Sequence, residues 1–107
     1  MSITNATLAL DNAAVAPSIY TSSGATAITT VYLCNRTTSA VTVNLFVVPA
    51  GTVASQTTNM IYSNLVVAGN DTYIMEAERL LFVNGDFLAA NASVNNSVVA
   101  TISYTGI

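Results

Sequence analysis

The chain has 107 residues, the size of a single domain that can bury a modest core without disulfide or metal support. Apolar residues make up 52% of it and charged residues only 7%, whereas ordinary soluble domains carry about 25% charged residues. Threonine, asparagine and serine supply about a third of the chain, so we expect neutral hydrogen-bonding groups to form its polar surface.

The charged residues limit the possible partners. The two cations, Arg36 and Arg79, cannot form the basic surface that nucleic-acid phosphates or anionic lipids require. The start of the chain has no basic residue followed by an apolar run, and the apolar runs are too short for a membrane helix. We therefore expect no secretory signal and neither a nucleic-acid nor a membrane partner.

The first 17 residues differ from the rest of the chain. They are rich in alanine and asparagine, with spaced apolar residues that include Ile3, Leu8 and Leu10. We expect residues 1–17 to form an N-terminal arm or a first edge strand, and an arm of this kind could dock on a partner.

Residues 18–107 have the two-residue period of β-strands. Residues 41–48 form two alternating sets. The set expected to face the core is Val41, Val43, Leu45 and Val47, and the other set is Thr42, Asn44, Phe46 and Val48. Residues 98–104 show the same period, with Val98 starting the inward set. The predicted strands are 19–22, 27–35, 41–48, 61–67, 72–76, 79–83, 87–93 and 98–104.

Turn residues separate these strands at the spacing of an all-β domain. Asn84-Gly85 predicts a tight hairpin that joins 81–83 to 87–89. Residues 51–59 are uncharged and aperiodic, and predict a loop at one end of the domain. The expected fold is an antiparallel β-sandwich, jelly-roll-like or Ig-like, of about eight short strands over residues 18–107.

The residues needed for most enzymatic chemistry are missing. The chain has no histidine, which removes the commonest general base and metal ligand. It has one cysteine, Cys34, too few for a thiolate metal site, and we expect Cys34 to be a small buried hydrophobe. The sequence therefore predicts a protein that is not an enzyme and holds no cofactor.

The carboxylates leave two alternatives open. Glu76 and Glu78 would share one face of a continuous strand, which is the arrangement of a glycosidase carboxylate pair. Asp71 and Asp86 lie in turn sequences, and a calcium site would take ligands from them and from turn carbonyls. We favour a structural role for all four. The turns explain the two aspartates, and no D-x-D-x-D loop occurs.

Two other patterns have structural and functional interpretations. Asn-x-Ser/Thr triplets, typical of glycoproteins, begin at Asn5, Asn35, Asn70, Asn91 and Asn95. The abundance of these three residue types accounts for the triplets. The tyrosines, which could line a sugar-binding face but more often cap a core, are Tyr20, Tyr32, Tyr62, Tyr73 and Tyr104.

Three segments resemble a family of small virion proteins of tailed bacteriophages. They are the I-Y-T-S of residues 19–22, the T-V-Y-L-C-N of residues 30–35 and the V-T-V-N-L-F-V-V-P of residues 41–49, followed later by Asn84-Gly85-Asp86 before a strand. The likeness covers roughly residues 18–107. It implies a virion component that decorates or cements the capsid, often as a trimer, and related sandwiches occur on tails and fibres.

The sequence and the resemblance together lead to one expected function. We expect a capsid decoration or cement protein that is made in the host cytoplasm, binds the major capsid protein and forms a homotrimer. The alternative is a tail, baseplate or fibre module that contacts a host glycan. The expected contacts with other proteins come from the arm and the 51–59 loop, through Ile3, Leu8, Leu10, Val53, Thr57 and Thr58.

Overall fold

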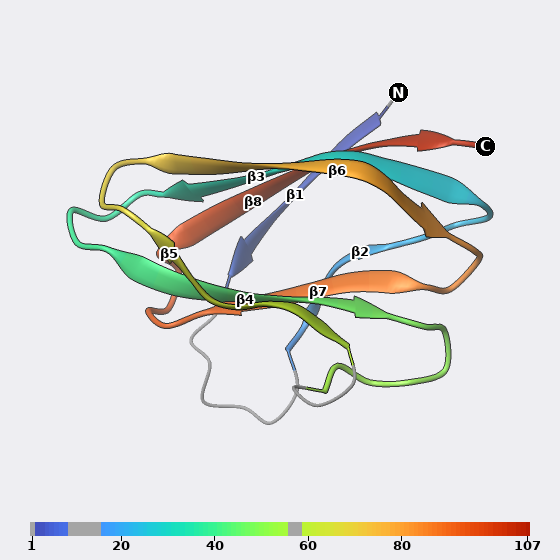
Figure 1. Ribbon diagram of the computed structural model, residues 1–107, viewed down its shortest axis with the longest axis horizontal. Helices are drawn as coiled ribbons and strands as arrows, with labels where there is room; N and C mark the ends of the chain where they lie inside the picture. Colours follow the sequence, from blue (N-terminus) through green and yellow to red (C-terminus); the bar gives the residue numbers. More distant parts are fainter. Residues whose placement is uncertain (1, 9–15, 56–58) are drawn as a thin grey trace.

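The computed structural model describes residues 2–8, 16–55 and 59–107, except for the side chains of residues 76–79. This part of the chain is all-β, and it forms two four-stranded antiparallel sheets packed face to face (Figure 1). The strands are β1 (Ser2–Leu8), β2 (Ser18–Thr21), β3 (Thr26–Asn35), β4 (Val41–Val48), β5 (Met60–Val67), β6 (Thr72–Phe82), β7 (Phe87–Ala92) and β8 (Val98–Gly106).

The predicted antiparallel β-sandwich is confirmed, and the strand order defines its topology. The first sheet has the order β1-β8-β3-β6 and the second has β2-β7-β4-β5. This order results when one long antiparallel ribbon, with the β4–β5 hairpin at its tip, is folded across two sheets. Such a ribbon is a jelly roll, whereas the sheets of an Ig-like sandwich have a different order.

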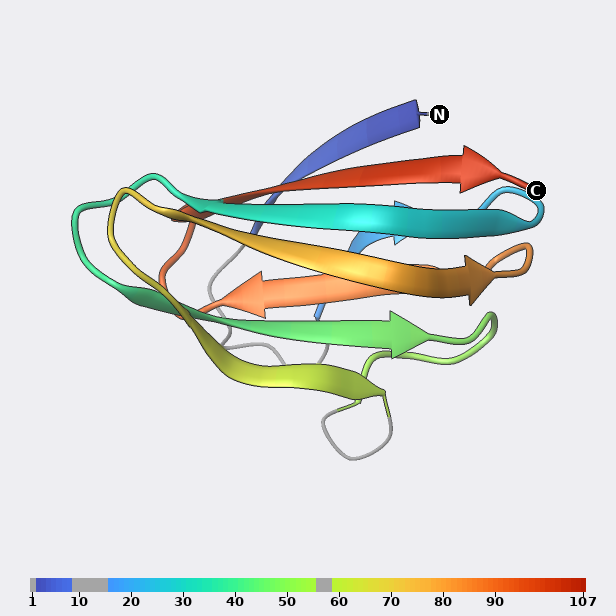
Figure 2. The same cartoon turned by 45° about the horizontal axis from the view of Figure 1, so that its top comes forward.

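The ribbon crosses between the sheets as pairs of connections (Figure 2). At one end the β3–β4 and β5–β6 connections lie together around Asn35, whose side chain is only 1% exposed. Its Nδ2 donates to the carbonyl oxygens of Ser39 and Val67, at 2.9 and 3.0 Å, and its Oδ1 accepts from the backbone and the hydroxyl of Thr37. The backbone nitrogen of Asn35 also donates to the carbonyl of Asp71.

At the opposite end the β2–β3 and β6–β7 connections are joined in the same way. The amide of Gly85 donates to the carbonyl of Ser22, and the amide of Ser22 donates to the carbonyl of Asp86. The amide of Gly24 donates to Oδ1 of Asn84 at 2.9 Å. These bonds keep the two chain reversals side by side.

The predicted hairpin at Asn84-Gly85 is wrong. Strand β6 pairs with β3 in the first sheet, whereas β7 pairs with β2 and β4 in the second, so this turn carries the chain from one sheet to the other. The turn residues predict a reversal, but they do not determine whether the two strands become partners.

The predicted strands 72–76 and 79–83 form the single strand β6. The register between β6 and β3 shifts between Ile28 and Thr30. On β6 this shift lies between Glu76 and Leu80, where the sequence predicted the break between two strands. The irregularity is therefore a bulge within one edge strand and not a turn between two strands.

The main core lies between the two sheets. Val41, Val43 and Leu45 are buried there and Val47 is partly buried, which confirms the inward set of β4. The inward set of β8 is also confirmed. The fully buried side chains of this core include Leu8, Ile28, Val31, Leu33, Val43, Leu45, Leu88, Val98 and Ile102.

A second, smaller core lies on the other face of β4 and β7. Phe46, Val48 and Ala89 are buried there beneath Ala16 and Ala54. The expected loop of residues 51–59 therefore does not simply project from one end, because its described part turns back over this sheet. Figure 1 shows this segment below β4 and β7.

Residues 2–8 form an edge strand and not a free arm. Strand β1 pairs with β8 in unbroken register from Ser2 opposite Tyr104 to Leu8 opposite Val98. Because Leu8 is 0% exposed, β1 contributes to the core of the sandwich.

We expect Gly69→Ala to destabilise the fold by about 1–3 kcal/mol, because the added Cβ would overlap the carbonyl of Thr38 where the connections cross. The matched control is Gly106→Ala, since no atom lies within 4 Å of a Cβ at that position and the expected change is within about 0.5 kcal/mol. Urea unfolding of both variants measures the difference. Equal stabilities would contradict the close approach of the two connections.

Candidate interaction surfaces

The structure separates the residues expected to contact other proteins. Ile3 is 67% exposed on β1 and Val53 is 63% exposed in the segment that covers the second sheet, so they belong to different layers. Leu8 is a correction, because it is fully buried in the main core and cannot act as a surface contact. Leu10, Thr57 and Thr58 lie outside the described residues.

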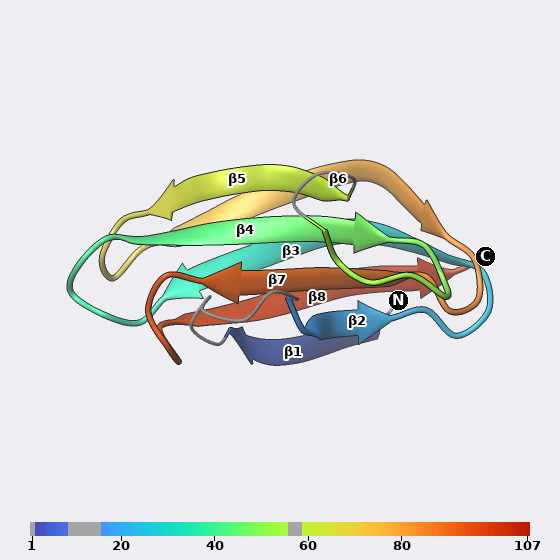
Figure 3. The ribbon, with the colours of Figure 1, turned by 90° about the horizontal axis from the view of Figure 1, so that it is seen from below.

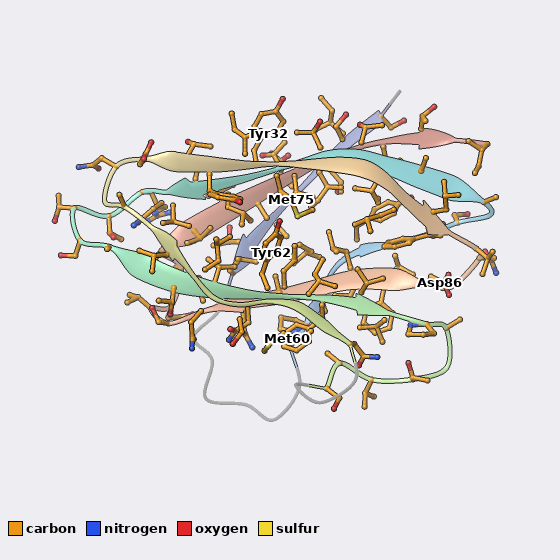
Figure 4. The ribbon with its side chains drawn as sticks, viewed as in Figure 1. Tyr32, Met60, Tyr62, Met75 and Asp86 are labelled. Atoms are coloured by element: carbon orange, nitrogen blue, oxygen red, sulfur yellow. The ribbon has the colours of Figure 1, made fainter. Side chains whose placement is uncertain are left out.

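Several large apolar side chains are exposed on the outer side of the first sheet. Tyr32 on β3 lies opposite Ile74 on β6 and Thr101 on β8, and Tyr32 and Ile74 are 40% and 53% exposed. Leu81, which is 60% exposed, lies opposite Ala27 further along the same pair of strands. Figure 4 shows Tyr32 pointing away from the sandwich, while Met75 on β6 points into it. We use the term outer face for the outward side of the first sheet, which includes Tyr32, Ile74, Leu81, Thr101 and Cys34.

Cys34 belongs to this surface, and the expectation that it is buried is wrong. It lies on β3 between the inward-facing Leu33 and Asn35, so strand alternation turns its side chain outward. Its cross-strand neighbours are Thr72 and Val99. Its position on the strand decides its burial, whatever the general preference of cysteine.

The charge of the first sheet is confined to β6, whose sequence places Glu76, Glu78 and Arg79 between Ile74 and Leu81. Strands β1, β3 and β8 contain no charged residue in their sequences. The charged residues with described side chains, Arg36, Asp71 and Asp86, all lie in the connections between strands. Over β1, β3 and β8 a partner would therefore meet methyl, ring, hydroxyl and amide groups.

Asp86 has a structural role. Its Oδ1 accepts from the amide of Ala50 and its Oδ2 from the amide of Val83, both at 2.9 Å. The carboxylate thus ties the β4–β5 connection to the β6–β7 turn, at the end of the sandwich marked in Figure 4.

The structure does not bring the aspartates together. Asp71 accepts from the amide of Thr72, and the whole of β6 separates it from Asp86, so the two carboxylates lie roughly 30 Å apart. The calcium site that would use both is therefore wrong. The side chains of Glu76 and Glu78 lie outside the described ones, so the carboxylate-pair alternative stays a hypothesis. Among the described side chains, no three carboxylates or thiols come together as metal ligands.

The tyrosines do not form one binding platform. Tyr20, Tyr62, Tyr73 and Tyr104 pack against the main core, and Tyr32 alone of the five lies on the outer face. Tyr20 and Tyr104 contact each other with ring centroids 4.5 Å apart, and Tyr62 meets Tyr73 edge to face at 6.3 Å. These contacts favour the core-capping interpretation of the tyrosines.

The glycosylation triplets fall into two groups. Asn35 and Asn91 are 1% and 4% exposed, so their side chains are not available for modification in the folded protein. The other three triplets begin at exposed asparagines.

Sequence reasoning missed the buried asparagine pair on the outer side of the second sheet. Nδ2 of Asn44 donates to Oδ1 of Asn91 at 3.0 Å, and Oδ1 of Asn44 accepts from the amide of Asn64 at 2.8 Å. Asn64 has a positive φ of 53° at a bulge of β5, so the Asn44 side chain satisfies an amide that has left the strand ladder. The sequence did contain a signal for this burial. Asn44 alternates on β4 in the same set as Phe46 and Val48, and these two apolar residues indicate that the outer side of the strand is covered as well.

No family model, curated protein or solved structure matches the chain. Within the described ranges there is also no helix long and apolar enough to cross a membrane. The inferences about function therefore depend on the surfaces described above and on the resemblance found in the sequence.

We expect Asp86→Asn to destabilise the protein by about 1 kcal/mol, because the amide nitrogen that replaces one carboxylate oxygen cannot accept a hydrogen bond. Asp71→Asn is the matched control. Its remaining oxygen can still accept from Thr72, so the expected change is within about 0.5 kcal/mol. Thermal and urea unfolding compare the two variants, and a larger loss for Asp71→Asn would overturn this assignment.

Tyr62 makes the stability of the fold depend on pH in the alkaline range. Burial raises the pKa of Tyr62 above its usual value of 10.0, and a hydrogen bond and charge repulsion with Tyr73 raise it further. The unfolded chain then ionises first, so the free energy of unfolding falls as the pH rises from about 10 through the higher pKa of the folded state. We expect Tyr62→Phe to flatten this fall in urea titrations. The same pH slope in both proteins would show that Tyr62 is not responsible.

Proposed function

We propose that this protein is a non-catalytic structural component of a phage virion, a decoration or cement protein that binds the assembled capsid shell through its outer face. The observation that carries the proposal is the exposure of three large apolar side chains, Tyr32, Ile74 and Leu81, on the outer side of the first sheet. Large exposed apolar side chains that gather on one face of a small domain often mark a protein-binding site.

The chemistry of the surface fits that role. Neutral hydrogen-bonding residues of β3 and β8 lie beside Tyr32, among them Thr101 directly opposite it, and contacts made by such groups depend little on salt. A protein that bridges neighbouring capsomers would bury more interface in the closed shell and stabilise it by mass action. The role in the virion comes from the sequence resemblance, and the homotrimer that it implies stays a prediction.

The fold is compatible with the proposal without selecting it. Jelly rolls occur in viral capsid proteins and in lectins, and a fold by itself does not identify a function. The glycan-binding alternative needs several exposed aromatic rings, but four of the tyrosines pack against the core. We therefore favour a protein partner.

The test is binding to purified capsid shells from which this chain has been stripped. We expect Tyr32→Lys to reduce occupancy at least roughly tenfold, because the interface would bury an uncompensated charge. Val66→Lys is the matched control, since Val66 is 63% exposed on β5 of the other sheet. Co-sedimentation measures occupancy, and circular dichroism confirms that both variants are folded.

Two outcomes would overturn the proposal. One is unchanged occupancy for Tyr32→Lys together with a loss for Val66→Lys, which would place the contact on the second sheet. The other is an image of the intact virion that shows the protein away from the shell. Deletion of the first residues is a poorer test, because it would remove β1 and the core side chain Leu8.

A further inference from the structure

The sandwich has four strand edges, formed by β1 and β6 in the first sheet and by β2 and β5 in the second. An unpaired edge exposes backbone donors and acceptors, and proteins usually block it with charges, proline, bulges or short strands. Three of the edges carry such a block. Strand β2 has only four residues and follows Pro17, β5 is bulged at Asn64, and β6 contains charged residues in its sequence.

Strand β1 has none of these protective features. Its seven residues, Ser2–Leu8, pair with β8 without a register shift and include neither a charged residue nor a proline. Figure 3 shows β1 at the lower margin of the molecule, beyond β2. Among the described segments none pairs with the other side of β1, so this side of a regular edge strand is available to another chain.

The backbone direction identifies the groups on that free side. The carbonyl of Leu8, which lies opposite Val98, accepts from the amide of Asn96 in the turn that leads into β8, so it points toward β8. The N–H and C=O of one residue point to the same side of a strand, and this side alternates along the chain. The backbone groups of Ile3, Asn5 and Thr7 consequently point away from β8, to the open edge.

We propose that β1 pairs antiparallel with β1 of a second copy of this chain, around a twofold axis at Asn5. This register places Asn5 opposite Asn5 and Ile3 opposite Thr7. All three outward backbone positions then find partners, with about six main-chain hydrogen bonds. Residues that share a face of β1 stay on one face of the joint sheet, because the register keeps their parity.

Charge supports a second copy as the partner. The net charge of −3 would oppose the approach of two copies if it lay at this edge. Neither β1 nor its neighbour β8 contains a charged residue, however, and the side chains of Ile3, Asn5 and Thr7 are exposed and neutral. The pairing would join two first sheets into one of eight strands and double the outer face. It departs from the homotrimer implied by the resemblance and does not depend on binding to a capsid.

The test uses sedimentation of the full chain and of two variants, Asn5→Lys and Asn5→Asp. We expect the unmodified chain to form a dimer. Each variant should weaken the dimer roughly tenfold, because the twofold axis places two like charges opposite each other. An equimolar mixture of the two variants should restore dimers, since it pairs a cation with an anion. High salt should partly restore the dimer of each variant alone.

Ser63→Lys is the matched control, because Ser63 is exposed on β5, an edge strand of the other sheet. It should leave the dimer unchanged, and circular dichroism of all variants checks that they fold. The proposal is overturned if the chain sediments as a monomer or a trimer, if the Asn5 variants dimerise as well as the original, or if their mixture fails to recover. A dimer without capsid binding would overturn the proposed function alone.

Discussion

The fold depends on pairs of connections that cross between the sheets together. In a jelly roll each strand and its ribbon partner must change sheets at the same place, and the backbone there leaves the regular ladder. Asn35 satisfies this requirement at one end with its buried amide. At the other end the backbones of Ser22 and Gly85 join the two connections, and the Asp86 carboxylate accepts from the amide of Val83. Among the described side chains no buried polar atom lacks a partner, so the crossings cost little in unsatisfied groups.

The crossings also make the two sheets unequal on their outer sides. The second sheet is covered by the chain itself, since Ala16 and Ala54 close over Phe46, Val48 and Ala89. The first sheet has no such cover among the described segments, and its outer residues remain exposed. This asymmetry leaves one broad face available to a partner, which is why the proposed function is assigned to the first sheet.

The same contrast applies to the edges of the sheets. The bulge of β5 displaces the amide of Asn64 from the ladder, and Asn44 accepts from it with its side chain. That edge is thereby irregular and satisfied within one chain, whereas β1 is regular and no other described strand pairs with its outer side. Neutral hydrogen-bonding residues are abundant in this chain, and they can satisfy backbone groups within one chain, as at β5, or between two chains, as proposed for β1.

The sequence by itself determined the all-β class and most strand positions, because alternation and turn residues are local signals. It also identified the inward sets of β4 and β8. Only the tertiary structure decided that Asn84-Gly85 joins different sheets, that Cys34 points outward and that Leu8 belongs to the core. Each of these depends on which strands become partners and which faces are covered, and these contacts join residues far apart in the chain. The surface open to other proteins follows from the same long-range contacts, so strand patterns alone could not locate it.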